Sequence, residues 1–147
     1  MKENVKKALE NNQEALHSLV ILHRASNTIY KQEVETLKKY NLTMGQFGVL
    51  EALYNKRNLR IQDLIEKLLS TSGNMTVVVR NMIRDGYISR ISDPRDKRAC
   101  LISLTDLGRE TIETILPEHY ENIGRIFAIL SLEEQEVLNS ILKKFKK

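Results

Sequence analysis

The stretch from Leu69 to Arg98 begins with a segment in which apolar and polar residues separate at helical spacing. Five apolar residues occupy positions i, i+3, i+4, i+7 and i+8, the stripe of an amphipathic helix: Met75, Val78, Val79, Met82 and Ile83. The opposite face is small, hydrogen-bonding and basic: Gly73, Thr76, Val77, Arg80 and Arg84. A helix that only faces water usually mixes Glu and Lys there, whereas this face has no carboxylate. We therefore predict that it approaches a negatively charged surface.

The N-terminal region is also helical by its periodicity, from Val5 to about Lys39, and Asn41 and Leu42 break it. Its apolar residues mark the side that is expected to be buried: Val5, Leu9, Leu16, Leu19, Val20, Val34 and Leu37. A helix or broken helix of this length cannot bury such a stripe against one short neighbour. We expect it to need several elements or a second subunit.

Capping patterns predict the next elements. Thr43 and Gln46 have the spacing of a capping box, for a helix that ends near Asn55. Residues 58–60 form a short link or a brief strand. Residues 61–68 are predicted to form a short helix.

The amphipathic helix follows, and after it a hairpin. Ser70, Thr71 and Ser72 are its N-cap candidates. Asp85 and Gly86 end it, because glycine suits the left-handed residue after a helix. Alternating strands over residues 87–91 and 98–104 then flank a polar turn at residues 92–97.

The C-terminal region is helical. Thr105 caps a long helical region in which Pro117 predicts a kink or a break. Ser131 and Glu134 form a second capping box, for a last helix that reaches about Phe145.

Together these elements predict a mainly α fold, with a minor β component, built on a winged helix-turn-helix. A short helix, a tight turn, a capped helix and a β-hairpin define that module, whose second helix enters the DNA major groove. Residues 1–147 are expected to form a single domain, with the winged helix-turn-helix at residues 43–104.

Composition and charge agree with this class. The chain has 147 residues, of which 41% are hydrophobic and 29% charged, and a net charge of +4. That charge is modest, so its distribution matters more than its total. Its single cysteine excludes an internal disulfide and a Cys-pair metal site. No signal peptide or membrane span is apparent, so a cytoplasmic location is the expectation.

The polar face of the amphipathic helix provides candidate DNA contacts. Arg80 can donate two hydrogen bonds to guanine or reach a phosphate, and Asn74 and Thr76 can read base edges. Val77 could pack on a thymine methyl group. The three residues at 70–72, with the backbone amides of the helix start, suit a phosphate. The alternative is a solvated face that happens to be basic.

The hairpin adds a second basic region. Between Arg80 and Arg98 the chain has six basic residues and three acidic ones. Arg95 lies at or near the tip of the turn and could enter a minor groove. Asp93, two residues earlier, could hold the Arg95 guanidinium in a fork. The alternative is a surface ion pair that stiffens the turn.

Four motifs in the order and spacing of the MarR (multiple antibiotic resistance regulator) family give the chain a specific resemblance. Residues 93–98 (Asp-Pro-Arg-Asp-Lys-Arg) match the Asp-x-Arg-x-x-Arg wing motif. Residues 104–108 resemble the Leu-Thr-x-x-Gly that follows the wing. Residues 70–76 resemble the start of the recognition helix, and residues 85–88 the junction between helix and wing.

The resemblance implies a homodimeric, ligand-responsive regulator of transcription, expected to be a repressor, that binds a pseudo-palindromic operator. Residues 1–40 and 105–147 would form the dimerisation part. Arg95 would enter the minor groove, Asp93 would position it, and Arg98 would support the wing or touch phosphate. The predicted DNA contacts are Ser70, Thr71, Ser72, Asn74, Thr76, Val77, Arg80, Asp93, Arg95, Lys97 and Arg98. Arg60 departs from the family, which often has a capping Thr or Ser there, so it either caps less well or meets a phosphate.

The resemblance also implies a small aromatic or phenolic effector, bound between the dimerisation helices and the winged part. Its binding residues are unknown, with Met44, Phe47, His23 and Tyr120 as candidates. No cofactor is predicted. His17 and His23 do not face each other on a helix, so no metal site is predicted, and no catalytic motif is present.

Two alternatives remain open. The first is a winged-helix module that binds an acidic protein partner through the same basic surface. The second is a regulator that responds to thiol oxidation through Cys100. Cys100 alternates with Ile102 and Leu104 on the second strand, so a small residue that faces the core is the simpler interpretation.

Overall fold

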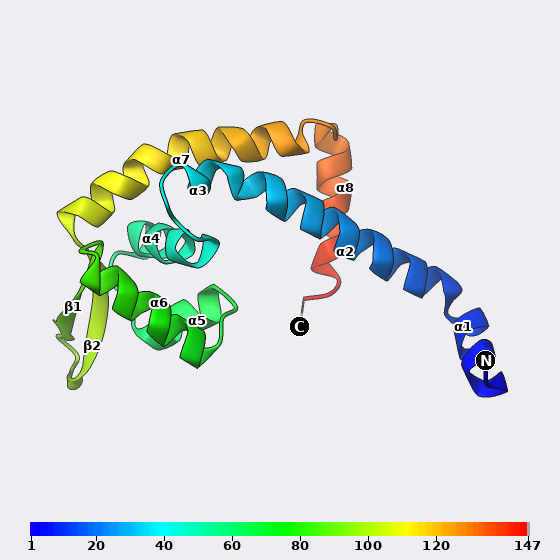
Figure 1. The fold of residues 1–147 in the computed structure, drawn as a ribbon, viewed down its shortest axis with the longest axis horizontal. Helices are drawn as coiled ribbons and strands as arrows, with labels where there is room; N and C mark the ends of the chain where they lie inside the picture. Colours follow the sequence, from blue (N-terminus) through cyan, green and yellow to red (C-terminus); the bar gives the residue numbers. More distant parts are fainter. Residues whose placement is uncertain (147) are drawn as a thin grey trace.

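The computed structural model describes residues 1–146, so Lys147, the last residue of the predicted dimerisation part, lies outside the described residues (Figure 1). The elements follow one another in this order: α1 (Glu3–Asn11), α2 (Gln13–Glu33), α3 (Glu35–Lys38), α4 (Met44–Lys56), α5 (Ile61–Lys67), α6 (Ser72–Arg84), β1 (Ile88–Asp93), β2 (Asp96–Leu104), α7 (Asp106–Phe127) and α8 (Leu132–Lys143). The predicted mainly helical winged helix with a two-stranded wing is confirmed.

The N-terminal helical region is broken at Asn12 and Val34 into α1, α2 and α3. Of its seven predicted apolar positions only Leu37 is buried. Burial of this stripe by a second subunit stays a prediction, but the alternative that several elements of the same chain cover it is wrong, because Leu9, Leu16 and Leu19 are each more than two-fifths exposed. Figure 1 shows the reason, because α2 projects away from the winged part toward α1 and the N-terminus.

The buried hydrophobic core lies within residues 37–116. It is built around α4, whose Val49, Leu50 and Leu53 are fully buried. The predicted stripe of α6 is confirmed, because Met75, Val79 and Met82 are buried and the other two positions are half-buried. Helix α6 therefore packs by one face and leaves the other to solvent.

Local capping fixes several helix starts, as predicted. The Thr43 Oγ1 accepts a hydrogen bond from the Gln46 backbone N–H at 3.1 Å, and the Thr43 N–H donates to Gln46 Oε1 at 3.0 Å. Ser131 and Glu134 form the same reciprocal pair at the start of α8. Thr105 caps α7, which therefore begins directly after the wing.

Two glycines join the wing to its neighbouring helices. Gly86 has a φ of 83°, the left-handed conformation that ends α6, as predicted. A Cβ at Gly108 would lie 2.0 Å from the Tyr87 carbonyl oxygen, so only glycine fits there. The first turn of α7 thus packs against the backbone that leads into the wing.

The wing is an antiparallel pair in which Ile88 lies opposite Leu104 and Asp93 opposite Asp96, with a register shift between Ser92 and Asp93. The turn is shorter than the predicted six residues and consists of Pro94 and Arg95. The strands are longer because backbone pairing continues through the polar residues that flank the turn. Residues 58–60 form the predicted short link, which pairs with the wing at a single bridge between Leu59 and Ile102 and is not a strand of its own.

Helix α7 runs through Pro117, so the alternative of a break there is wrong. Its axis changes direction along its length in Figure 1, as a proline kink would produce. Pro117 and Glu113 are both exposed, and water can therefore bond the Glu113 carbonyl that loses its helical partner. The helix therefore continues through Pro117 with one intrahelical hydrogen bond fewer.

Candidate nucleic-acid interface

The outward face of α6 is the first part of the candidate interface. The predicted contact residues there, Ser72, Asn74, Thr76, Val77 and Arg80, are all exposed, and Val77 is 43% exposed. Residues 72–84 contain no Asp or Glu. The helix therefore presents short polar side chains, one apolar side chain and a guanidinium to solvent.

The start of α6 is fixed by three hydrogen bonds. Thr71 is the N-cap, and its Oγ1 accepts from the Asn74 backbone N–H at 3.2 Å. The Asn74 Nδ2 donates to Ser70 Oγ at 3.3 Å. Thr76 Oγ1 donates to the Ser72 carbonyl at 2.8 Å. Ser70 is half-buried, so it supports the helix start more than it faces solvent.

The two arginines of α6 differ in their surroundings. Arg84 Nε lies 3.0 Å from Asp85 Oδ1, and this contact raises the pKa of Arg84. Arg80 has no ion-pair partner within residues 1–146. Arg80 is therefore the guanidinium of this helix that is available to a ligand.

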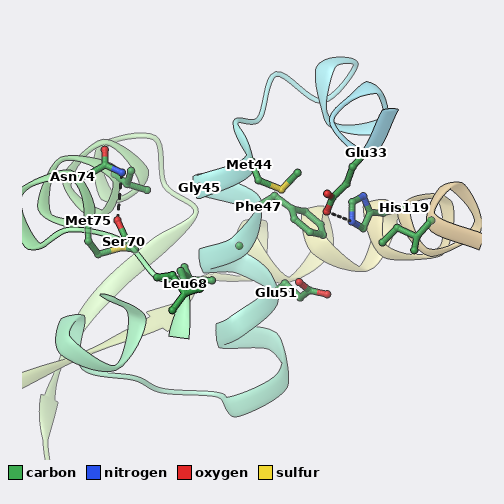
Figure 2. Close-up of a pocket in the computed structure, with 14 residues that line it drawn as sticks. Glu33, Met44, Gly45, Phe47, Glu51, Leu68, Ser70, Asn74, Met75 and His119 are labelled. Carbon is green, nitrogen blue, oxygen red and sulfur yellow. Dashed lines mark hydrogen bonds and ion pairs between the residues drawn. The ribbon is translucent and has the colours of Figure 1, made fainter. Parts of the chain in front are cut away.

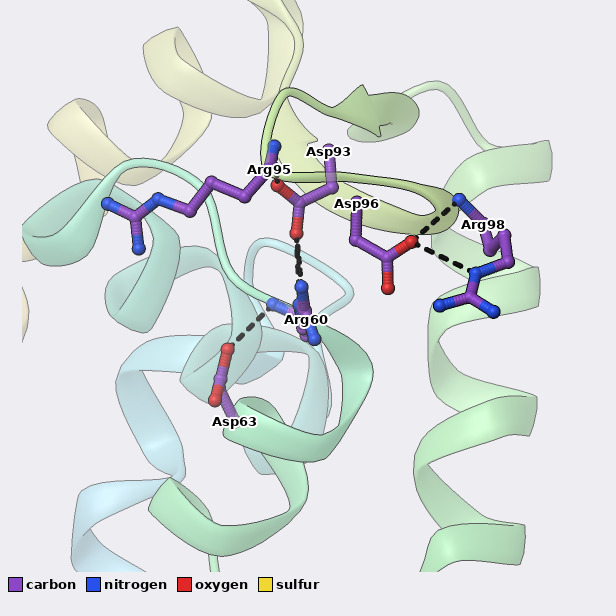
Figure 3. A network of polar contacts seen from close by, with 6 residues as sticks. All are labelled: Arg60, Asp63, Asp93, Arg95, Asp96 and Arg98. Atoms are coloured by element: carbon purple, nitrogen blue, oxygen red, sulfur yellow. Dashed lines mark hydrogen bonds and ion pairs between the residues drawn. The ribbon is translucent and has the colours of Figure 1, made fainter.

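The wing turn is organised around Asp93, which is only 4% exposed (Figure 3). Its Oδ1 accepts a hydrogen bond from the Arg95 backbone N–H at 2.9 Å. Its Oδ2 accepts from Arg60 Nε at 3.0 Å and from Arg60 Nη2 at 2.6 Å. The predicted fork between Asp93 and the Arg95 guanidinium is wrong, because Arg60 occupies the carboxylate and Asp93 contacts only the backbone of Arg95.

These contacts shift the pKa values of both Asp93 and Arg60. The Arg95 backbone N–H and the Arg60 guanidinium hold the pKa of Asp93 below its usual value, against the opposing effect of desolvation. The hydrogen bond to Asp93 raises the pKa of Arg60. Asp93 is thus an ionised carboxylate at neutral pH, and the wing turn retains its two attachments there.

The exposed end of the wing carries the remaining predicted contacts. Arg95 and Lys97 are exposed and have no ion-pair partner among the described residues. Arg98 is 93% exposed by its side chain, and its Nε lies 3.4 Å from Asp96 Oδ1. The wing therefore offers three cations to solvent, of which only Arg98 has a nearby carboxylate.

Cys100 lies on β2 but is exposed, so the interpretation that it faces the core is wrong. Its register partner is Ser92, near the turn, whereas the core reaches only as far as Ile102 and Ile88. Alternation along a strand predicts burial only where another layer covers the sheet. Exposure alone does not make the thiol a redox site.

A groove of about 450 Å³ lies between the winged part and α7 (Figure 2). Of the four candidate effector contacts, Met44 and Phe47 line it, whereas His23 and Tyr120 do not. His23 lies on the projecting α2, and the Tyr120 hydroxyl lies on the surface, where it donates to Glu51 Oε1 at 3.0 Å. The lining includes Glu33, Glu51 and the buried His119, but no lysine or arginine of the described chain.

His119 also lines this groove, although the sequence did not predict it as an effector contact. It is 2% exposed, and its ring centroid lies 4.3 Å from that of Phe47. Its Nε2 lies 3.8 Å from Glu33 Oε1, and its Nδ1 has no hydrogen-bond partner. Its neighbours come from distant segments, so no local pattern could have indicated this placement.

No group of three or more His, Cys, Asp and Glu side chains is placed to hold a metal ion within residues 1–146. None of the helices in that range combines the length and apolar character needed to cross a bilayer.

Comparison with known proteins places this geometry in a family. Residues 42–100 match the model of the MarR family. The chain is 35% identical over 130 residues to the HTH-type transcriptional regulator YkoM of Bacillus subtilis, covering 88% of this chain and 84% of that protein. It is 30% identical over 132 residues to the HTH-type transcriptional regulator MhqR of the same organism, covering 90% and 91%.

Solved structures agree with the fold. A probable transcriptional regulator from Pseudomonas aeruginosa superposes with a TM-score of 0.76 at 28% identity, covering 85% of this chain and 93% of that one. A mutant MarR from Escherichia coli, in complex with operator DNA, superposes with a TM-score of 0.80 at 22% identity, covering 92% and 98%. The arrangement of helices and wing described above is therefore the one found in these proteins.

Proposed function

Because this chain belongs to the MarR family of DNA-binding transcriptional regulators, we propose that it is a repressor that binds a pseudo-palindromic operator as a homodimer. The family consists of transcription regulators and not of enzymes. Helix α6 would lie in the major groove and the wing in the adjacent minor groove. The observation that carries the proposal is the outward face of α6, which has no carboxylate, beside a wing tip whose Arg95 has no ion-pair partner in residues 1–146.

Each contact follows from its place on that surface. Arg80 would read guanine or bind phosphate, Asn74 and Thr76 would meet base edges, and Val77 would pack on a thymine methyl. Ser70, Thr71 and Ser72 would place the helix start against a phosphate. On the wing, Arg95 would enter the minor groove, while Lys97 and Arg98 would bind the backbone.

The homodimer is supported by the terminal helices. Helices α1, α2 and α8 contain no buried residue, although they carry exposed apolar side chains such as Leu16, Leu19, Val137 and Ile141. Exposed apolar faces of this extent are typical of an interface between subunits. A two-fold dimer built from them would place two α6 helices about 34 Å apart, one turn of DNA.

The groove beside His119 is the proposed effector site. In two structural neighbours the ligands are hydroxylated aromatic acids: 6-hydroxynicotinic acid with BpsR of Bordetella bronchiseptica and 4-hydroxyphenylacetate with NadR. The groove of this chain has apolar walls and two carboxylates, Glu33 and Glu51, with no lysine or arginine among its described lining residues. It therefore favours an aromatic effector without a negative charge.

Effector binding would act through the position of the winged part. The groove is lined by α4 and α6 on one side and by α7 on the other. A ligand that prefers one spacing of these elements shifts the population toward it and changes the distance between the two α6 helices. Release of the operator follows when that distance no longer matches the DNA.

Fluorescence anisotropy with DNA from upstream of the gene for this protein tests the proposal. The expected result is specific binding that weakens steeply with salt, because phosphate contacts release counterions. The absence of salt-dependent specific binding, with no ligand added, would overturn it and would favour a module that binds an acidic protein.

Effector charge is tested separately by calorimetry. The methyl ester of 4-hydroxyphenylacetate should bind more tightly than 4-hydroxyphenylacetate itself, because Glu33 and Glu51 repel the carboxylate. The Glu33→Gln variant should reduce the difference in affinity between the ester and the acid. Tighter binding of the acid would contradict the proposed preference.

A further inference from the structure

The two oxygens of Asp93 have separate partners on the two sides of the wing turn. Oδ1 accepts from the backbone of Arg95, the second residue of the turn, at 2.9 Å. Oδ2 accepts from two nitrogens of Arg60, which is 33 residues earlier in the chain and precedes α5. One buried carboxylate therefore joins the helix-turn-helix to the turn of the wing (Figure 3).

We propose that Arg60 is the positioning residue of the wing, because through Asp93 it fixes the turn that presents Arg95 to DNA. This rests on the role of Arg95 proposed above. Arg60 itself need not touch DNA for this role.

Arg60 is well placed to be such an anchor. Its own backbone N–H donates to Asp63 Oδ2 at 2.9 Å, in the first turn of α5. The residue before it, Leu59, exchanges two backbone hydrogen bonds with Ile102, at 3.2 and 2.7 Å. The helix-turn-helix thus attaches to the wing at two levels, through Leu59 at the base and through Arg60 at the turn.

The second attachment matters because a hairpin of two strands has little stability of its own. Its base is covered by the core at Ile88 and Ile102, whereas Ile91 and Cys100 near the turn are exposed. Apolar packing therefore does not define the position of the turn. Instead, the Arg60–Asp93 ion pair joins the turn to the helices.

The chemistry of arginine suits this contact. Nε and Nη2 both donate to Oδ2, which fixes the orientation of the guanidinium and of the carboxylate. A lysine offers a single charged group on a flexible stem and fixes neither. Loss of Arg60 would leave Asp93 without its cation, and its carboxylate would turn toward water and release the Arg95 N–H.

Amide hydrogen exchange, measured by NMR on the full chain without DNA, tests the attachment. In Arg60→Met the Arg95 amide should exchange about tenfold faster or more, while the Ile102 amide at the wing base stays unchanged. In Arg60→Lys the exchange rate of the Arg95 amide should lie between those of the wild type and of Arg60→Met. Arg90→Met, which removes an exposed arginine of the same wing, is the matched control and should leave Arg95 unchanged. Unchanged exchange at Arg95 in Arg60→Met would overturn the proposal.

Operator affinity in a double-mutant cycle then separates positioning from direct contact. If Arg60 acts through Asp93, Arg60→Met should cost little further affinity in the Asp93→Asn background, and the salt slope should stay unchanged. If Arg60 instead binds a phosphate, the losses would add and the slope would fall by about one. That second result would overturn the proposal.

The two measurements fail independently. Exchange at Arg95 needs no DNA, so it reports on the attachment even if the chain does not bind the operator. Absence of operator binding by the wild-type chain would contradict the proposed function alone. Faster exchange at Arg95 with unchanged operator affinity in Arg60→Met would show that the attachment does not serve DNA binding and would overturn the positioning role.

Discussion

The winged part and the terminal helices use the same apolar periodicity with opposite results. Residues 37–116 bury a continuous core that includes Leu50, Met82 and Ile112. Helices α1, α2 and α8 bury no residue, although α2 alone exposes Leu16, Leu19, Val20, Ile21 and Leu22. A helical stripe therefore predicts a contact surface but does not indicate whether the same chain covers it.

Helix α7 belongs to both regions. Its first half contributes Ile112, Ile115 and Leu116 to the core. Its second half lies along α2, where Asn122 Nδ2 donates to the Gln32 carbonyl at 2.9 Å. A change in the angle of α7, at whose middle His119 meets the groove, would therefore move the winged part relative to the terminal helices.

The largest expected effect comes from breaking the proposed interface between subunits. Leu19→Asp places a charge on the exposed apolar face of α2, so the dimer should dissociate while the winged part stays folded. Operator affinity should fall by about 10²- to 10⁴-fold, because two linked sites become one. Sedimentation and fluorescence anisotropy measure the two quantities.

The matched control for this change lies on the same helix. His17→Asp adds the same charge about 200° around α2 from Leu19, on the side that also carries Gln13 and Arg24, and should leave the dimer intact. A Leu19→Asp protein that remains dimeric would show that α2 does not form the interface.

The core of the winged part should respond differently. Leu50→Ala removes a fully buried side chain and should lower the free energy of unfolding by about 2–5 kcal/mol. The loss should be the same in the dimer and in the Leu19→Asp monomer, because the contacts of Leu50 lie within one chain. Chemical denaturation of each protein measures it.

Val137→Ala in α8 is the contrasting substitution. Val137 is 58% exposed in the single chain, so truncation should cost stability in the dimer and almost none in the monomer. A loss of equal size in both would mean that α8 packs within its own chain, and it would remove the contrast between the two regions.

Local features of the fold were predictable from the sequence. The caps at Thr43, Thr71, Thr105 and Ser131 depend on residues three positions apart, and all four are present. The buried face of α6 follows from spacing alone. These features involve neighbours in sequence, and short-range patterns contain the information that determines them.

Features that depend on distant residues were not predictable. Asp93 could be paired with Arg95 by proximity in sequence, but the fold brings Arg60 to it across 33 residues. Cys100 alternates correctly with Ile102, yet the core ends before it. The groove at His119 combines residues from α2, α4, α6 and α7. In each case the missing information was which other segment lies against the residue.

Within the winged part, Arg95→Ala should separate DNA binding from assembly. The dimer should stay intact, because Arg95 lies on the wing turn and far from α2 and α8 in Figure 1. Operator affinity should fall by about 1–3 kcal/mol as the minor-groove contact is lost. Anisotropy at physiological salt and sedimentation test both statements.

Lys97, a second exposed cation of the wing, provides the control for Arg95. Lys97→Ala should weaken binding to specific and to nonspecific DNA by similar factors, as the loss of a phosphate contact does. Arg95→Ala should weaken binding most for operators with A·T-rich flanks. Unchanged affinity of Arg95→Ala would remove Arg95 from the mechanism.

The smallest expected effect concerns Val77, the apolar residue on the outward face of α6. Val77→Ala should lower discrimination at one A·T position by about 1 kcal/mol or less, because alanine keeps part of the contact with a thymine methyl. Stability should rise slightly, since alanine has the higher helix propensity and Val77 is 43% exposed, outside the buried core. The opposite signs of the two effects distinguish a DNA contact from a structural one. A uniform loss across DNA sequences would contradict the methyl contact, and a loss of stability would show that Val77 serves the fold of the winged part.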